Sequence, residues 1–137
     1  MIEAGVIIST NGEPLYWHEP RHSSGALPDS RALWDHIWKA HQDGWLAGFA
    51  HSHPGSGVPG PSDTDISTFV AIEQAIGRPL SWWITSADRL VVINRSMMDS
   101  VPGRVIYAVS EVMVEREPFW VAELRRRSEV TSTGPYR

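Results

Sequence analysis

The chain begins with a strand-like pattern of apolar residues. Residues 3–10 (EAGVIIST) are rich in apolar and β-branched side chains, and residues 11–19 (NGEPLYWHE) resume that pattern after an Asn11-Gly12 pair. An Asn-Gly pair between two such runs is a strong signal for a tight hairpin. We therefore expect two antiparallel strands at the start of the chain.

Two later segments have helical periodicity. We expect the first helix to begin at Asp29 or Ser30, after a loop over residues 20–29 that is rich in glycine, proline and serine, and to end near Gly44. A second helix is expected from Ser62 to about Gly77. The side chains expected to face the core are Leu33, Trp34, Ile37 and Trp38 in the first helix and Ile66, Phe69, Val70 and Ile76 in the second.

The remaining apolar runs are short. Residues 45–51 (WLAGFAH) suit a buried strand, residues 80–86 and 89–95 read as two strands joined at Ala87-Asp88, and residues 103–114 fit either a strand or a helix. Strands mixed with two helices predict a single α/β domain with a central mixed sheet flanked by helices. We expect this domain to span residues 1–124 and to be followed by a polar, flexible tail at 125–137.

Composition narrows the classes of function. The 137 residues carry a formal net charge of −4, which argues against nucleic-acid binding, and the Arg125-Arg126-Arg127 cluster is interpreted as part of the solvated tail rather than as a binding patch. The absence of cysteine excludes disulfides, cysteine zinc ligands and a cysteine nucleophile. Without a membrane-length apolar run or a signal-peptide pattern, we expect a soluble cytoplasmic protein with no membrane partner.

The stretch from Gly48 to Ser67, GFAHSHPGSGVPGPSDTDIS, carries the candidate chemistry. His51 and His53 are two positions apart at a strand end, so both side chains point to one face, and Asp65 falls in the first turn of the second helix. Two histidines and a carboxylate form a known catalytic zinc ligand set. Taken separately, Ser62-Asp-Thr-Asp65 is also a helix cap and His-x-His an ordinary polar strand end, but their conjunction favours a metal site.

This stretch resembles the signature of the JAMM/MPN metalloprotease family, in which His-Ser/Thr-His-Pro is followed by a loop and Pro-Ser-x-x-Asp. The resemblance implies a cytidine-deaminase-like α/β fold, one Zn²⁺ per chain held by His51, His53 and Asp65, and a Ser62 hydroxyl that stabilises the oxyanion. It also implies hydrolysis of peptide or isopeptide bonds next to ubiquitin-like tails. Eight residues separate His53 from Ser62 where the family usually has seven, and we assign the extra residue to the Gly-rich loop.

A metal-activated water also needs a proton acceptor. The family uses a glutamate on an early strand, and Glu3 opens an otherwise apolar strand in EAGVII. Glu3 is therefore our candidate general base, Glu19 is a reserve candidate, and Glu13 is assigned to the solvated hairpin turn. The alternative for Glu3 is that it merely ends a strand.

The resemblance, and not the spacing, supplies the partner class. Small prokaryotic members of the family act on ubiquitin-like or sulfur-carrier proteins, so such a protein is the expected substrate. One alternative is a non-catalytic scaffold like the family's metal-free branch, and another is a zinc deaminase, which the lack of a Pro-Cys-x-x-Cys motif argues against. Trp82 and Trp83 are expected on opposite faces of their strand, chiefly for packing, and His18, His22, His36 and His41 are interpreted as ordinary polar residues.

Overall fold

The computed structural model describes residues 3–19, 31–96 and 105–133 and shows an α/β domain with one six-stranded sheet. The expected loop at 20–29, His22 and the last residues of the expected tail, 134–137, lie outside the described residues. The strands are β1 (Gly5–Ser9), β2 (Pro14–His18), β3 (Leu46–Ser52), β4 (Ser81–Thr85), β5 (Leu90–Arg95) and β6 (Tyr107–Val112). The helices are α1 (Arg31–Gln42), α2 (Asp63–Ile76) and α3 (Trp120–Thr133), with a short 3₁₀ turn, η1, at Val114–Arg116.

The sheet is mixed, with the order β2-β1-β3-β4-β5-β6. The β3–β4 pair is parallel and the other neighbouring pairs are antiparallel. The predicted hairpin is confirmed between β1 and β2, where Gly12 has a φ of 84° that few other residues adopt. The ambiguous segment near the C-terminus contains strand β6.

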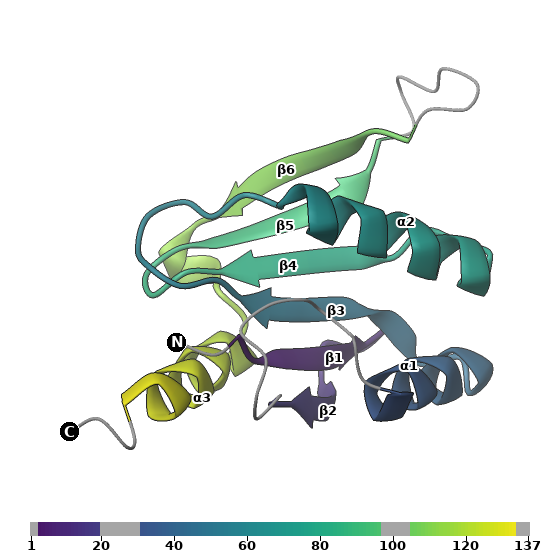
Figure 1. Cartoon of the computed structure of the whole chain (residues 1–137), viewed down its shortest axis with the longest axis horizontal. Coiled ribbons are helices and arrows are strands. Elements are labelled where there is room, and N and C mark those ends of the chain that lie inside the picture. Colours follow the sequence, from purple (N-terminus) through teal and green to yellow (C-terminus); the bar gives the residue numbers. More distant parts are fainter. Residues whose placement is uncertain (1–2, 20–30, 97–104, 134–137) are drawn as a thin grey trace.

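Parallel pairing of β3 and β4 requires a crossover connection, and α2 provides it (Figure 1). The loop and helix start that leave the carboxyl end of β3 therefore lie at one end of the sheet. Ligands in α/β proteins commonly bind outside the carboxyl ends of parallel strands, so this end is where a site is expected.

Helices cover both faces of the sheet. On one face, α1 and α2 bury Leu33, Ile37, Phe69 and Ile72 against Ile7, Phe49, Trp82, Ile84 and other residues of the central strands. On the other face, α3 buries Trp120, Val121 and Leu124 against Ala4, Val6, Ile8 and Ala50. Trp82 and Trp83 point to opposite faces as expected, with Trp82 fully buried and Trp83 packed edge-on against Trp120.

The C-terminal helix corrects one expectation. Residues 125–133, expected to be part of a flexible tail, continue helix α3, in which Leu124 and Ser128 are fully buried. Arg125 is not a solvated end residue, because its guanidinium makes two hydrogen bonds to Glu117, at 2.8 and 2.9 Å, and a third to Thr85 Oγ1 at 3.0 Å. The described part of the chain contains no helix of the length and apolar character needed to cross a membrane.

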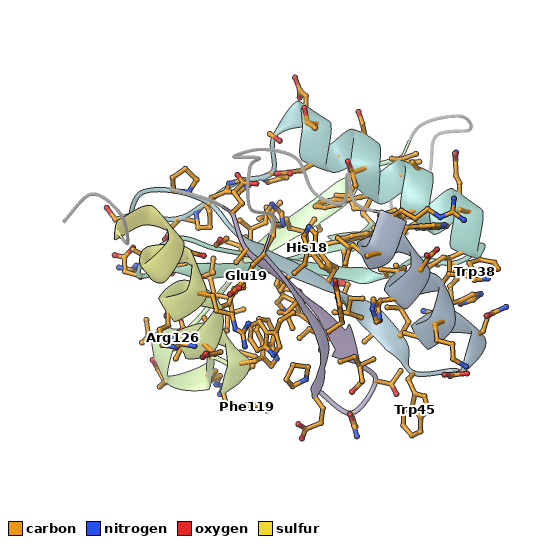
Figure 2. The ribbon with its side chains drawn as sticks, turned by 60° about the horizontal axis from the view of Figure 1, so that its bottom comes forward. His18, Glu19, Trp38, Trp45, Phe119 and Arg126 are labelled. Carbon is orange, nitrogen blue, oxygen red and sulfur yellow. The ribbon has the colours of Figure 1, made fainter. Side chains whose placement is uncertain are left out.

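Trp38 corrects a second expectation. Its side chain is 38% exposed on the outer side of α1 (Figure 2), where it stacks on Trp34 instead of entering the core. Trp34 is partly buried against the core, as expected. The two tryptophans differ because four residues advance a helix by slightly more than one turn, and Trp38 falls beyond the edge of the sheet-facing stripe.

Candidate metal centre

Three side chains converge at the carboxyl end of β3. The Nε2 atoms of His51 and His53 are 3.0 Å apart, His53 Nε2 is 3.1 Å from Asp65 Oδ2, and His51 Nε2 is 3.4 Å from Asp65 Oδ1. His51 and Asp65 are buried and His53 is partly buried. The structure thus brings together the three residues that the sequence proposed as metal ligands.

The local structure explains this convergence. His51 and His53 alternate with Ser52, so both imidazoles point to the face of the sheet that α1 and α2 cover. Helix α2 begins with a capping box, in which Ser62 Oγ accepts the N–H of Asp65 at 3.0 Å and Asp65 Oδ2 accepts the N–H of Ser62 at 2.9 Å. One carboxylate therefore caps the helix and also reaches the histidines.

The histidine nitrogens and carboxylate oxygens of the cluster lie close enough together to hold a small cation. Zinc binds imidazole and carboxylate ligands at about 2.0–2.1 Å, so two ligands of a tetrahedral site lie about 3.3 Å apart. The two imidazole nitrogens are 3.0 Å apart, and each has one Asp65 oxygen close to it, Oδ2 at 3.1 Å from His53 and Oδ1 at 3.4 Å from His51. The ligand atoms of His51, His53 and Asp65 can therefore hold one metal ion.

Electrostatics set the charges of the cluster. Burial alone would raise the pKa of Asp65, but hydrogen bonds from both imidazoles and from the Ser62 N–H outweigh it and hold that pKa well below its ordinary value. Burial lowers the pKa of His51, whereas the hydrogen bond to Asp65 raises the pKa of His53. The carboxylate is therefore anionic near pH 7, burial favours the neutral form of His51, and the contact with Asp65 favours a proton on His53, which a metal ion would have to displace.

One buried nitrogen of the cluster, Nδ1 of His51, has no hydrogen-bond partner among the described residues. Metal-binding histidines usually donate their other N–H to an acceptor. The polar contacts of this imidazole are therefore all made by Nε2, on the side of His53 and Asp65.

Glu3 lies beside the cluster. Gly5 pairs with His51, and the N–H of Ser52 donates to the carbonyl of Ala4 at 3.0 Å, so the same register places Glu3 opposite His53. Directly opposed residues of antiparallel strands point to the same face. Burial raises the pKa of Glu3 to about 7, with nearby His53 lowering it and Asp65 raising it. A carboxyl group titrating near neutrality beside a metal cluster suits a general base.

The other two glutamates differ from Glu3. Glu19 follows β2 and lies 3.3 Å from the guanidinium of Arg127, on the α3 face of the sheet and thus opposite to both imidazoles (Figure 2). Glu13 is exposed in the hairpin turn. Glu3, in contrast, lies where His53 and Asp65 influence its pKa.

The extra loop residue leaves the position of Asp65 intact. Thr64, which a rigid count from His53 would select, is exposed, while Asp65 contacts both histidines. In the capping box the Ser62 hydroxyl acts as an acceptor, so the cap leaves its proton unused. Ser62 therefore lies next to a candidate ligand with a hydrogen-bond donor to offer.

The glycine- and proline-rich loop is attached to the β4–β5 turn, which sequence reasoning did not identify. The Ala87 N–H donates to the Gly55 carbonyl at 2.9 Å, the Gly57 N–H donates to Asp88 Oδ1 at 2.8 Å, and the Ser86 hydroxyl donates to the Gly57 carbonyl at 2.6 Å. These bonds fix the segment between the histidines and Asp65. The sequence predicted the turn at Ala87-Asp88 but not its hydrogen bonds to Gly57, which come from residues 29 and 31 positions away.

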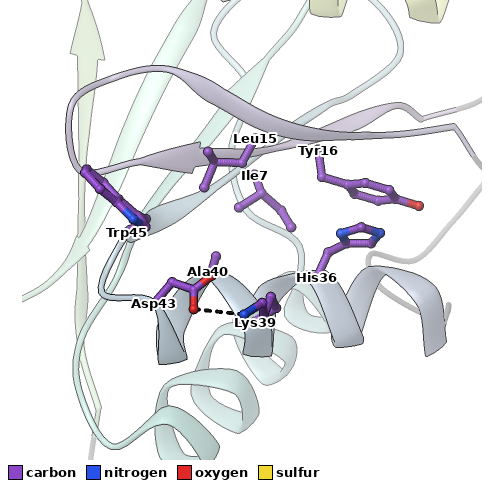
Figure 3. A pocket seen from close by; sticks show the side chains of 8 residues that line it. All are labelled: Ile7, Leu15, Tyr16, His36, Lys39, Ala40, Asp43 and Trp45. Atoms are coloured by element: carbon purple, nitrogen blue, oxygen red, sulfur yellow. Dashed lines mark hydrogen bonds and ion pairs between the residues drawn. The ribbon is translucent and has the colours of Figure 1, made fainter.

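A cavity of about 190 Å³ lies toward the other end of β1, between β2 and α1 (Figure 3). Its lining includes Leu15, Tyr16, His36, Lys39, Asp43 and Trp45, and none of the proposed ligands. His36 stacks on Tyr16 with 3.8 Å between ring centroids, and Lys39 pairs with Asp43 at 3.0 Å. These polar side chains already have partners within the cavity wall, so we do not place the chemistry here.

Two comparisons with known proteins found no match for this chain, neither among protein-family models nor among curated proteins.

Proposed function

We propose that this protein is a zinc-dependent metallopeptidase or isopeptidase of the JAMM/MPN type. The observation that supports it most directly is the convergence of His51, His53 and Asp65 into a group that could hold one metal ion, with Glu3 beside them. The motif resemblance adds the reaction class, because the same residues stand where that family has its ligands and base.

Zinc, Glu3 and Ser62 each have a separate role in the proposed reaction. When bound, zinc supplies an acidified water as the nucleophile and polarises the substrate carbonyl. Glu3 accepts the proton of the attacking water and then delivers it to the leaving amine, which a pKa raised to about 7 allows in both directions. The Ser62 hydroxyl donates to the developing oxyanion, an interaction typically worth about 2.7–4 kcal/mol.

The proposed substrate is the C-terminal tail of a ubiquitin-like or sulfur-carrier protein, in a cytoplasmic setting. This part of the proposal is supported by the resemblance alone. An extended tail of small residues fits the chemistry, because a backbone without bulky side chains can approach a partly buried centre closely.

The direct test uses ubiquitin-like and sulfur-carrier proteins whose C-terminal Gly-Gly is joined to a fluorophore by a peptide or an isopeptide bond. We expect zinc-dependent release that a chelator abolishes and that His53→Ala and Glu3→Gln both lack. Asp63→Asn is the matched control, because Asp63 is an exposed acidic residue in the same helical turn as Asp65. Stoichiometric zinc binding without any cleavage would favour a scaffold, and release of ammonia from a nucleoside panel would favour a deaminase.

A further inference from the structure

Two buried serine hydroxyls lie directly behind the metal centre. Ser128 of α3 donates to Ser52 Oγ of β3 at 2.5 Å, and Ser52 Oγ accepts the N–H of Ala4 at 2.9 Å. Ser128 is 0% exposed, Ser52 2% and Ala4 3%, so water cannot replace these bonds. The three residues form a continuous polar contact from the C-terminal helix to the first strand.

This contact joins the two strands that carry the proposed chemistry. Ser52 stands between the two histidines, and Ala4 follows Glu3. Since side chains alternate along a strand, the Ser52 hydroxyl points toward α3 while both imidazoles point to the opposite face. Figure 1 shows α3 beside the start of β1, on the side where the chain enters the sheet.

A backbone and a side-chain hydrogen bond join the two strands at this point. Beyond the Gly5–His51 pair, Ala4 precedes the first residue of β1, and its carbonyl accepts the Ser52 N–H at 3.0 Å. The N–H of Ala4 has the Ser52 hydroxyl as its acceptor. Glu3 is therefore held opposite His53 by this backbone hydrogen bond together with a side-chain hydrogen bond, whose serine Ser128 contacts.

We propose that Ser52 and Ser128 are positioning residues that hold Glu3 in register with the two histidines. The proposal rests on the proposed function for its catalytic consequence, but not for its structural basis. It assigns a role to α3, which supplies none of the proposed ligands and does not contribute the proposed base. Apolar burial attaches the helix, and the hydroxyl pair fixes the offset between the strands at the site.

The test compares Ser52→Ala, Ser128→Ala and the double variant with Ser9→Ala in the zinc-loaded full chain. Ser9 is a matched control, because it is a buried serine (2% exposed) at the far end of β1 whose hydroxyl accepts the Glu13 N–H at 3.1 Å. We expect amide exchange at Ala4 to accelerate about fivefold or more in the Ser52 and Ser128 variants, as for loss of one buried hydrogen bond. We also expect kcat to fall about three- to tenfold with KM and zinc affinity unchanged.

The double variant adds a second criterion. If the two hydroxyls act through one contact, the kcat of the double variant is no lower than that of Ser52→Ala. If they act independently, the fold-losses in kcat of the two single variants multiply. Unchanged exchange at Ala4, or faster exchange with an unchanged kcat, would overturn the proposal, as would a loss of kcat of equal size in Ser9→Ala. If the wild-type protein cleaves none of the substrates, the proposed function fails, and exchange at Ala4 still decides whether the serines hold the strands in register.

Discussion

Zinc should stabilise this protein against heat by an amount that depends on Asp65. At about 2.1 cal/mol/K per residue, a chain of 137 residues has an unfolding entropy of about 0.29 kcal/mol/K. Above the Kd, each tenfold increase in free zinc adds about 1.4 kcal/mol to the free energy of unfolding, which raises Tm by about 5 °C. Mutating a residue that only hydrogen-bonds to a metal ligand commonly weakens metal binding by about 10–100-fold. Removing the charge of Asp65, a ligand itself, should therefore weaken zinc binding by at least about 100-fold.

The rise in Tm caused by zinc should therefore be about 10 °C smaller for Asp65→Asn than for the wild type, at a buffered zinc concentration well above the Kd of both proteins. Without zinc the variant should already be about 1–3 kcal/mol less stable in free energy of unfolding, because its neutral amide loses the charge-assisted hydrogen bonds with the imidazoles, although its oxygen can still accept the Ser62 N–H of the capping box. Scanning calorimetry over a series of zinc buffers measures both quantities. Asp63→Asn should follow the wild-type curve, and an equal zinc-dependent rise in Tm for all three proteins would refute the metal site.

Three further predictions concern stability and pH. In the metal-free protein, Glu3 binds a proton more tightly folded than unfolded, so its contribution to stability is present below about pH 4.5 and is lost as pH rises through about 7. Glu3→Gln should reduce the loss of stability between about pH 4.5 and pH 7 by about 1–2 kcal/mol, a value reduced for partial exposure. Urea unfolding at several pH values measures this loss, and an unchanged pH dependence would contradict the raised pKa. Gly5→Ala would place a methyl carbon 2.2 Å from the Phe49 ring and should cost about 1–3 kcal/mol, whereas Gly60→Ala, with nothing within 4 Å, should cost far less; equal losses in urea unfolding would argue against this packing. Glu73 is a buried carboxylate paired with Arg95 at 3.1 Å, so Glu73→Gln should cost about 3–5 kcal/mol while zinc affinity, measured by competition with a chromophoric chelator, stays the same.

The buried carboxylate of Glu73 shows what periodicity cannot reveal. Its two oxygens accept hydrogen bonds from the Leu80 N–H at 2.8 Å, from Trp82 Nε1 at 3.0 Å and from the Tyr107 hydroxyl at 2.5 Å. In the sequence it is one glutamate on an amphipathic helix, where a solvated position is the default. Its donors come from segments up to 34 residues away and are brought together only by the packing of α2 on the sheet.

The sequence by itself determined the elements whose signals are local. The Asn11-Gly12 turn, the cap at Ser62, the stop at Gly77 and the apolar runs of the central strands depend on backbone preferences and periodicities within a few residues. The same locality placed His51 and His53 on one face of a strand. It also placed Asp65 in the first turn of a helix, so the candidate ligands were available before any fold was known.

Tertiary structure decided which of these side chains meet. A loop of eight residues can bring Asp65 to the histidines or leave it in solvent, and its attachment to the β4–β5 turn determines which. The C-terminal helix was missed because its buried stripe, Val121, Leu124 and Ser128, contains a serine and is interrupted by three consecutive arginines. That stripe is stable only against Ala4, Ala50 and Ser52, since burial and partners far away in the sequence, rather than local propensity, supply its free energy.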